Sequence, residues 1–206
     1  MSDLTSRVSR ALRGAGAATS AQLQQICGAS QASVSRALAP LLAAGEVLKV
    51  GRGRNQAYVM PRHVQGVTAT GTIPVMKVDS RGKVSEFGSL IPTVGGRCWI
   101  EEFEQGVARL HGGLPWFLAD MRPQGFLGRA FAHLHRGLGM AENPDHWSDD
   151  DVLKSLCLAG EDLPGNLVIG DAAFARFMHT PAPQPVSPQG YAALADLAMR
   201  GALPGS

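Results

Sequence analysis

The 206-residue sequence contains few cysteines and no long apolar run. Its three cysteines, Cys27, Cys98 and Cys157, lie far apart and form no CxxC pair. This pattern argues against a zinc site or a disulfide framework and is typical of a protein in a reducing cytoplasm. No stretch reaches the roughly 20 apolar residues that span a bilayer, and the N-terminus lacks the apolar core of a secretory signal. We therefore expect a cytoplasmic protein without a membrane partner.

The composition favours a folded protein of mixed architecture. Hydrophobic residues make up 45% of the chain, which is enough for a packed core. The 25 glycines and 13 prolines favour a loop-rich, partly β structure over a helical bundle. We expect an α+β protein.

Positive charge is concentrated near the N-terminus. Residues 1–62 contain eight basic and two acidic residues, a net charge of +6, whereas residues 63–206 contain 11 basic and 15 acidic residues, a net charge of −4. Such a difference between two parts of a chain suggests that the basic part binds a polyanion. Basic residues also often serve only to solvate a surface, so the charge alone leaves nucleic-acid binding open.

Two helices are predicted at the start of the chain. Apolar residues repeat at helical spacing over residues 4–12, and glycines follow that end this helix. Thr19 or Ser20 can cap a second helix. Its inward-facing residues are predicted to be Leu23 and Ile26.

A third helix is predicted after a tight break at Gly28, where glycine can take a positive φ. Ser30 caps this helix, which is expected from Gln31 to Ala44. Pro40 removes a backbone hydrogen bond, so we expect a kink near residues 36–40 or an early end. The apolar stripe consists of Val34, Leu38, Leu41 and Leu42.

Residues 20–38 resemble the helix-turn-helix of bacterial repressors. A glycine lies in the turn, a capping serine follows, and small polar residues open the recognition helix. Gln24 departs from the pattern, because such motifs usually have a small residue there. Two strands, predicted over residues 46–50 and 56–60, follow the recognition helix. A hairpin in this place is a wing, so residues 1–62 are interpreted as a winged helix-turn-helix that binds double-stranded DNA.

The candidate DNA-binding residues lie on the recognition helix and on the wing. Base edges are reached from the start of such a helix, where arginine can bind guanine, and glutamine adenine, through paired hydrogen bonds. Two arginines on a glycine-rich tip suit phosphates or a minor groove. The alternative is a protein-interaction module with solvated arginines. The predicted set is Ser30, Gln31, Ser33, Ser35 and Arg36 on the helix, and Arg52 and Arg54 on the wing.

A second domain is expected over residues 71–180, after a linker at 63–70. Its first part is a β-meander, with strands predicted at 72–78, 83–90 and 97–100. An Asx-type turn from Asp79 to Gly82 and a glycine turn at 94–96 join these strands.

Helices are predicted in the rest of this domain. One spans residues 125–138, and a second begins after Ser148, which caps it. The three aspartates that follow Ser148 favour the positive end of a helix, so a cap is the preferred interpretation over a metal site. A last strand is predicted at 166–170. The side chains expected to be buried in the first of these helices are Phe126, Leu127, Ala130, Phe131 and Leu134.

Two stretches of the second domain carry a resemblance to a known family. They are residues 113–129, GLPWFLADMRPQGFLGR, and residues 160–167, GEDLPGNL. Both are similar to the N-terminal subdomain of HipA-family serine/threonine kinases, the toxins of toxin–antitoxin modules. The resemblance to the YjjJ-like subgroup is closer, because that subgroup also begins with a helix-turn-helix. It covers nearly the whole chain and implies a HipA-like N-terminal subdomain over residues 71–180.

The resemblance also implies that the catalytic machinery is absent from these residues. The family's Gly-rich phosphate loop, catalytic aspartate and metal ligands follow this subdomain, and this sequence ends about where that loop would begin. Residues 181–206 are interpreted as a Pro-rich linker and a helix that lead towards a kinase core. We therefore expect no enzyme activity, no cofactor and no metal site.

Two functions follow from the resemblance. The first is a DNA-binding regulatory module of a HipA-like toxin–antitoxin kinase, active in transcription regulation. The second is a stand-alone antitoxin that binds and restrains a separately encoded HipA-type serine/threonine kinase. The expected partners are double-stranded DNA and a HipA-type kinase core, in cis or in trans. A homodimer is a further expectation, because winged helices commonly bind two-fold sites as dimers.

Overall fold

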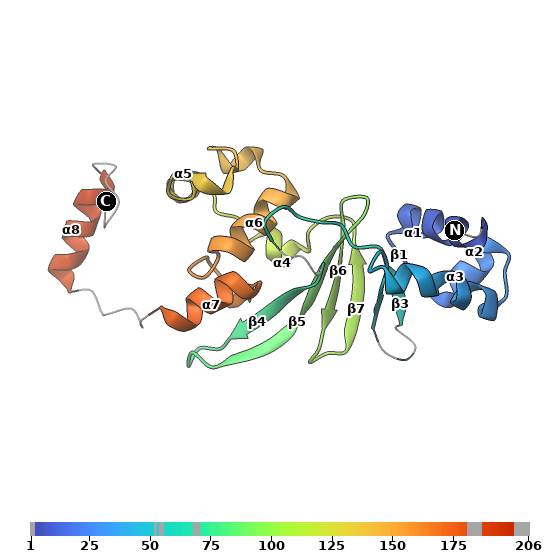
Figure 1. Ribbon diagram of the computed structural model, residues 1–206. Coiled ribbons are helices and arrows are strands. Elements are labelled where there is room, and N and C mark those ends of the chain that lie inside the picture. Colours follow the sequence, from blue (N-terminus) through green and yellow to red (C-terminus); the bar gives the residue numbers. More distant parts are fainter. Residues whose placement is uncertain (1–2, 52, 54–55, 68–70, 181–186, 200–206) are drawn as a thin grey trace.

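The computed structural model describes residues 3–51, 53, 56–67, 71–180 and 187–199 (Figure 1). This part of the chain contains helices and two antiparallel sheets, one of three strands and one of five. The predicted α+β fold class is thereby confirmed. Each sheet belongs to a separate structural unit, and the two units are described in turn.

The N-terminal unit consists of three helices and the small sheet. Its sheet has the strand order β1-β3-β2, and both pairings are antiparallel. Its buried core comes from all three helices and includes Val8, Leu12, Leu23 and Leu38. In chain order the elements are α1 (Asp3–Ala15), β1 (Ala17–Ala18), α2 (Ser20–Cys27), α3 (Gln31–Ala43), β2 (Leu48–Val50) and β3 (Ala57–Val59).

Side-chain caps explain where α2 and α3 begin. The Thr19 hydroxyl accepts a hydrogen bond from the Gln22 backbone N–H, and the Gln22 side chain accepts one from the Thr19 N–H, which forms a capping box. Gly28 ends α2 in the left-handed region, at φ 55°. Ser30 caps α3 by accepting from the Ser33 N–H. These three predicted boundaries are confirmed.

One prediction for this unit is wrong, and a second is wrong in one of its two alternatives. Ile26 is 58% exposed, and Cys27 is buried in its place. Cys27 lies four positions after the buried Leu23, so both lie on the same side of this short helix. Pro40 does not end α3, which continues to Ala43. Pro40 is exposed, so the backbone carbonyl that loses its partner lies on the solvent side.

The second unit is built on the five-stranded antiparallel sheet. Its order is β7-β6-β5-β4-β8, so the strand that follows most of the helices returns to the β4 edge. The predicted Asx turn joins β4 to β5, because the Asp79 carboxylate accepts from the N–H groups of Arg81 and Lys83. The strands are β4 (Ile73–Val78), β5 (Val84–Thr93), β6 (Arg97–Glu102), β7 (Val107–His111) and β8 (Leu167–Ile169). The sequence interpretation did not include β1 or β7.

Helices cover one face of this sheet (Figure 1). The core between the two layers contains Leu90, Ile100, Leu118, Leu153 and Leu156. The helix α8 continues the chain beyond α7, at the end of the molecule opposite α1–α3 (Figure 1). The helices are α4 (Trp116–Ala119), α5 (Gly125–Leu134), α6 (Asp149–Ala159), α7 (Asp171–His179) and α8 (Pro188–Met199).

The burial predicted for α5 is wrong at three of its five positions. Phe126, Leu127 and Leu134 are all exposed, Leu127 to 77%, and the helix ends at Leu134. It packs instead through its small residues, Gly128 and Ala132. A Cβ at position 128 would lie 2.7 Å from the backbone of Pro123, so only glycine permits this close contact. The small side of α5 therefore faces the core together with the partly buried Phe131, whereas Phe126, Leu127 and Leu134 face outward.

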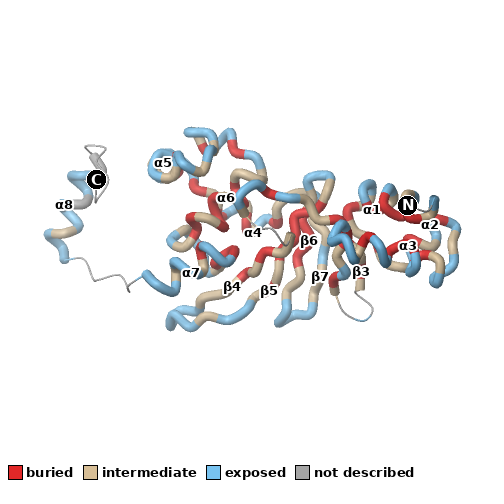
Figure 2. Tube along the Cα trace, viewed as in Figure 1, coloured by how far each residue is buried: buried red, intermediate tan, exposed pale blue. Residues whose placement is uncertain are grey.

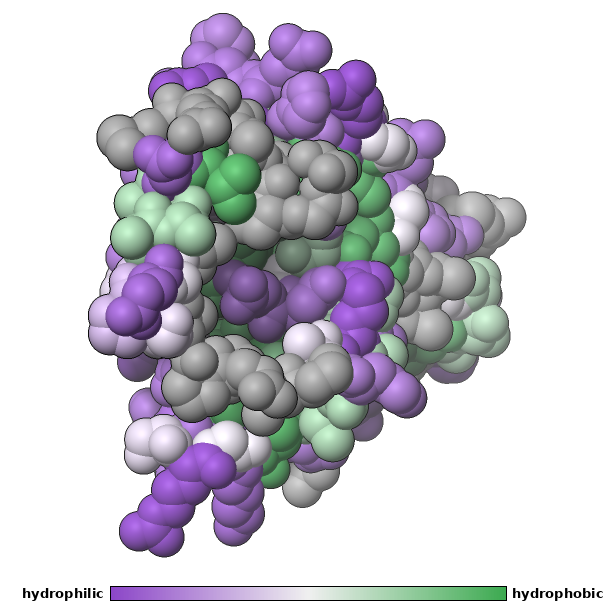
Figure 3. Space-filling view, turned by 90° about the vertical axis from the view of Figure 1, so that its left-hand side faces the viewer, coloured by the Kyte–Doolittle hydropathy of each residue, from purple (hydrophilic) through white to green (hydrophobic). Residues whose placement is uncertain are grey.

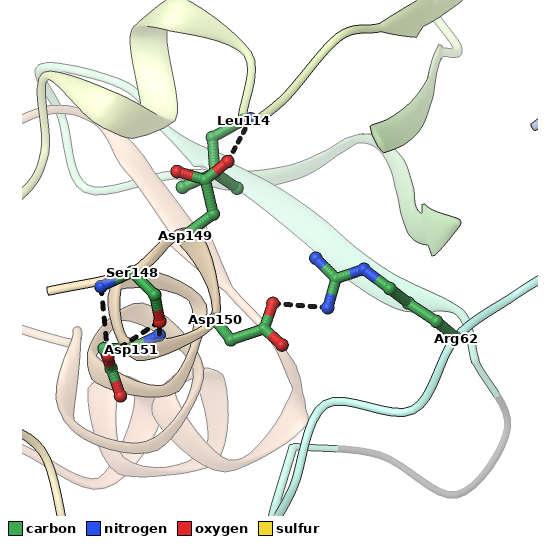
Figure 4. A network of polar contacts seen from close by, with 6 residues as sticks. All are labelled: Arg62, Leu114, Ser148, Asp149, Asp150 and Asp151. Carbon is green, nitrogen blue, oxygen red and sulfur yellow. Dashed lines mark hydrogen bonds and ion pairs between the residues drawn. The ribbon is translucent and has the colours of Figure 1, made fainter. Parts of the chain in front are cut away.

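The start of α6 uses all three consecutive aspartates (Figure 4). Ser148 and Asp151 form a capping box, and Asp149 Oδ2 accepts from the Leu114 N–H at 3.1 Å. Asp150 forms an ion pair with Arg62, in the segment that joins the two units. The predicted cap is confirmed, and two of the aspartates also tie other segments to α6.

A third, smaller core joins the two units. We call it the seam core; its buried members are Val50, Ala57 and Val59 from the small sheet and Ile91 and Trp99 from the large sheet. Side chains alternate along a strand, so Trp99 faces the N-terminal unit while its neighbours on β6 face the helices. Figure 2 shows buried residues on both sides of this contact. The N-terminal unit therefore covers part of the second face of the large sheet, around Ile91 and Trp99.

Backbone hydrogen bonds and one arginine reinforce the seam core. The Val94 N–H donates to the Met60 carbonyl at 3.0 Å, and the Arg62 N–H donates to the Pro92 carbonyl at 2.8 Å. The Arg97 guanidinium donates to the Gly14 carbonyl at 2.8 Å, across the two units. The N-terminal unit is thus packed against the second unit.

Candidate nucleic-acid interface

The first half of α3 presents a polar face to solvent. Gln31, Ser35 and Arg36 are exposed, whereas Val34 and Leu38 on the other side are fully buried. The two sets lie on different sides of the helix, because residues three to four positions apart share one side. Buried contacts therefore fix the backbone of α3 and leave this face available to a partner.

Ser30 and Ser33 contribute differently from the other predicted residues. The Ser30 hydroxyl accepts from the Ser33 N–H at 3.3 Å, and the two hydroxyl oxygens are 3.0 Å apart. Ser33 is partly buried. Both side chains are thus engaged in starting the helix. Their hydroxyls fix where the helix begins and so position the exposed face, but they contribute less to that face than the other predicted residues do.

Arg36 is the basic residue of this face. Its guanidinium Nε donates to the Ala32 carbonyl at 3.4 Å, one turn earlier in the helix. Ion pairs between described residues involve the cations Arg7, Arg62 and Arg176. Within that part of the chain, Arg36 has no acidic partner. Its charge is therefore available for an anion or a base edge.

Further basic residues of the N-terminal unit are exposed outside the predicted set. Arg10 and Arg13 lie on α1, and Lys49 occupies the outward-facing position of β2. Lys49 could have been found from its alternation with the apolar residues on either side of it in the sequence. Arg7 instead donates to the Cys27 carbonyl and joins α1 to the end of α2.

The hairpin between β2 and β3 carries the two remaining predicted residues. Arg52 and Arg54 lie outside the described residues. At the base of the hairpin, the Gly51 N–H donates to Glu101 Oε2 of the large sheet at 3.3 Å. Gly53 takes a left-handed conformation at φ 56°, which favours glycine at this position. The hairpin is therefore anchored to the second unit at its base.

The described residues offer neither a metal cluster nor a membrane-spanning helix. No group of three or more histidine, cysteine, aspartate or glutamate side chains suited to a metal ion occurs in the described ranges. In those ranges no helix is long and apolar enough to cross a membrane. Burial raises the pKa of the Cys98 and Cys157 thiols to about 12, so both are poor nucleophiles.

Comparisons with known proteins identify relatives of this chain. The family described as "YjjJ-like toxin, middle domain" matches residues 69–178, more than half of the chain. The curated protein "Toxin YjjJ" of Escherichia coli (strain K12) is 31% identical over 212 residues, an alignment that covers 100% of this chain and 45% of that protein. The chain thus spans about half the length of this relative. No solved structure gives a significant match. This chain belongs to the family of YjjJ-like toxins.

Proposed function

We propose that the N-terminal unit binds double-stranded DNA and acts as the regulatory module of a YjjJ-like toxin. One observation carries the proposal. The polar start of α3, with Gln31, Ser35 and Arg36, is exposed and has no acidic partner among the described residues. An element that binds in a major groove needs polar side chains that reach base edges and a positive charge close to the phosphates.

The topology supports a winged helix-turn-helix. The order helix, short strand, two helices and hairpin occurs in one unit, and Gly28 makes the tight turn between α2 and α3. In such a unit the third helix enters the major groove, and the hairpin that follows contacts the backbone or the minor groove. Arg52 and Arg54 belong to this hairpin in the sequence. The net charge of +6 over residues 1–62 supports the same reading.

The relative supports a role within a toxin system. It is named a toxin, and this chain corresponds to about half of its length. In the proposed arrangement, residues 1–62 supply the operator binding that antitoxins commonly provide. Residues 71–180, a HipA-like N-terminal subdomain, connect that binding to a kinase core. No catalytic role is proposed for these residues.

Exposed apolar side chains favour a second candidate, an antitoxin that binds a separately encoded kinase core. Trp116, Phe126, Leu127 and Leu134 are all exposed on the helical layer of the second unit. Figure 3 shows the end of the molecule that is distant from α3, where hydrophobic side chains reach the surface between hydrophilic ones. Large exposed apolar residues that gather on one surface often mark a protein–protein contact.

The DNA-binding proposal is tested by removing the hairpin arginines. Fluorescence anisotropy of a labelled duplex should give a lower affinity for Arg52→Ala/Arg54→Ala than for the natural chain. The salt dependence should also weaken by about two in log–log slope, since about one counterion is released per phosphate contact. The control is Arg129→Ala/Arg136→Ala, an equal loss of charge on exposed residues of the second unit. Unchanged binding by the hairpin variant would remove the hairpin from the interface.

The second candidate is tested by co-purification with a separately encoded HipA-type kinase core. The antitoxin role predicts a stable complex with the natural chain. Leu127→Asp should weaken the complex, whereas Lys154→Asp should not. A kinase core that does not bind the natural chain would exclude this role and would leave the DNA-binding proposal untouched.

A further inference from the structure

A hollow of about 230 Å³ lies beside the second half of α5. Arg129, Ala132 and His133 share one side of this helix, because residues three and four positions apart are neighbours on a helix surface. The chain then forms a short 3-10 helix, η2 (Arg136–Leu138), which ends at Gly139 in the left-handed region. Residues from α5, η2 and the loop that follows enclose the hollow, and they are Arg129, Ala132, His133, Arg136, Met140 and Glu142.

This hollow lies in a basic stretch of an acidic unit. Residues 121–141 contain three arginines, two histidines and no aspartate or glutamate. Residues 63–206 as a whole contain 11 basic and 15 acidic residues, a net charge of −4. Arg129, His133 and Arg136 are all exposed, so a ligand in the hollow can reach them. Positive charge gathered in this way attracts an anionic group.

Charged side chains of both signs line the hollow without an ionic partner. None of the ion pairs between described residues includes Arg129, Arg136 or Glu142. In that part of the chain, Arg129 and Glu142 also make no hydrogen bond. Opposite charges thus line one space without pairing with each other. A ligand that carries an anionic and a cationic group can form charge-assisted hydrogen bonds with both.

The guanidinium of Arg136 is already held in place at the hollow. Its Nε donates to the His133 carbonyl at 3.3 Å, and one of its terminal nitrogens lies 2.8 Å from His133 Nδ1. An arginine side chain has many rotamers, and restricting them when a ligand binds costs free energy. The contacts with His133 reduce that cost, because they restrict Arg136 before an anion arrives.

Two apolar residues complete the lining. Ala132 is 5% exposed, and Met140 is partly buried and packs against the main core of the second unit. A methionine adapts its shape to an apolar neighbour more readily than a branched side chain does. The hollow therefore offers an apolar surface next to its charged groups.

We propose that this hollow binds a free α-amino acid with an apolar side chain. Arg129 and Arg136 hold its carboxylate, Glu142 holds its ammonium group, and Ala132 and Met140 contact its side chain. The volume is below the usual range for drug-sized ligands, which fits a molecule of this size. A ligand with only one sign of charge would leave either the arginines or the glutamate unpaired. Binding at this site does not depend on the proposed DNA binding.

The test uses L-leucine and two probes that keep its side chain. The first probe, 4-methylpentanoate, lacks the ammonium group, and the second, 3-methylbutylamine, lacks the carboxylate. Each compound is titrated into the ¹⁵N-labelled full chain at low salt, and the backbone amide resonances are followed. L-leucine should shift the amides of residues 129–142 in a saturable manner. Neither probe should saturate these shifts over the same range of concentration.

Matched variants check the location of the site. Arg129→Gln and Glu142→Gln should each weaken L-leucine binding by about tenfold or more, because each removes a charge-assisted hydrogen bond. Arg81→Gln and Glu86→Gln, which change exposed charges elsewhere in the second unit, should bind as the natural chain does. Unchanged amide resonances in β4 and α6 would show that all four variants are folded.

Three results would each overturn the proposal. The first is that L-leucine produces no saturable shift up to its solubility limit. The second is that Arg129→Gln or Glu142→Gln binds L-leucine as tightly as the natural chain does. The third is that 4-methylpentanoate binds as tightly as L-leucine, since the hollow would then be a site for anions in general.

Discussion

Replacing Ile91 with alanine tests whether the seam core makes the two units fold together. Ile91 lies on β5 opposite Trp99 and is 3% exposed. Truncation of a buried isoleucine to alanine removes apolar contacts and leaves a cavity, which typically costs about 2–5 kcal/mol. Because small domains are stable by only about 5–15 kcal/mol, Ile91→Ala should lower the free energy of unfolding by a large fraction.

Urea unfolding followed by two probes provides the measurement. Far-ultraviolet circular dichroism reports the helices of both units, whereas tryptophan fluorescence reports the second unit, which holds all three tryptophans, and the seam core, which contains Trp99. We predict coincident transitions for the natural chain and a parallel shift of both in Ile91→Ala. Leu127→Ala, an equally apolar truncation at an exposed position, should change stability by less than about 0.5 kcal/mol. Separate transitions by the two probes in the natural chain would refute a shared core.

Three further predictions concern single positions. Gly88→Ala should lower the free energy of unfolding by about 2 kcal/mol or more, because the added Cβ would lie 1.9 Å from a backbone oxygen of β6. Gly112→Ala should be neutral in the same urea assay, because a Cβ at position 112 would have no heavy atom within 4 Å. Burial lowers the pKa of His135 from 6.5, so this side chain is protonated at a higher pH in the unfolded chain than in the folded chain. The free energy of unfolding should therefore fall as the pH drops below about 6.5, and it should fall less steeply in His135→Asn. Equal slopes in the two proteins would contradict this. With the pKa of both thiols at about 12, Cys98 and Cys157 should resist iodoacetamide in the folded chain at pH values near 8 and react after unfolding, as measured by mass spectrometry; equal rates in both states would contradict their burial.

Local chemistry explains the parts of the fold that could be predicted. The starts of α2, α3 and α6 follow from Thr19, Ser30 and Ser148, each of which bonds a backbone N–H within its own helix. The β4–β5 turn follows from Asp79 in the same way. Such interactions involve residues only a few positions apart, so they can be read from the sequence alone.

Long-range packing explains what could not be predicted. Periodicity identified α5 as a helix, but the choice of its buried side depends on the fit of Gly128 against Pro123 and Pro144. Trp99 faces the N-terminal unit because β6 is covered on both sides, and a strand covered on both sides lacks alternation. Neither contact joins neighbouring residues within one element, so neither leaves a pattern in the sequence.

The candidate interface contains one feature that was predictable from the sequence and one that was predictable only in part. The exposure of Gln31, Ser35 and Arg36 was predictable from the apolar stripe of α3, since the opposite side of that helix must face solvent. The use of the Ser30 and Ser33 side chains in the cap was only partly predictable, because the contact between their hydroxyls depends on the rotamers that both adopt.

An NMR titration of the ¹⁵N-labelled chain with a DNA duplex at low salt tests the central claim most directly. DNA binding through α3 and the hairpin predicts that backbone amide shifts will concentrate at residues 30–36 and 51–56, and that added salt will reverse them. Amides of β4 and α7 in the second unit should stay in place. An absence of shifts, or shifts confined to the second unit, would contradict the assignment of this unit as the DNA-binding module.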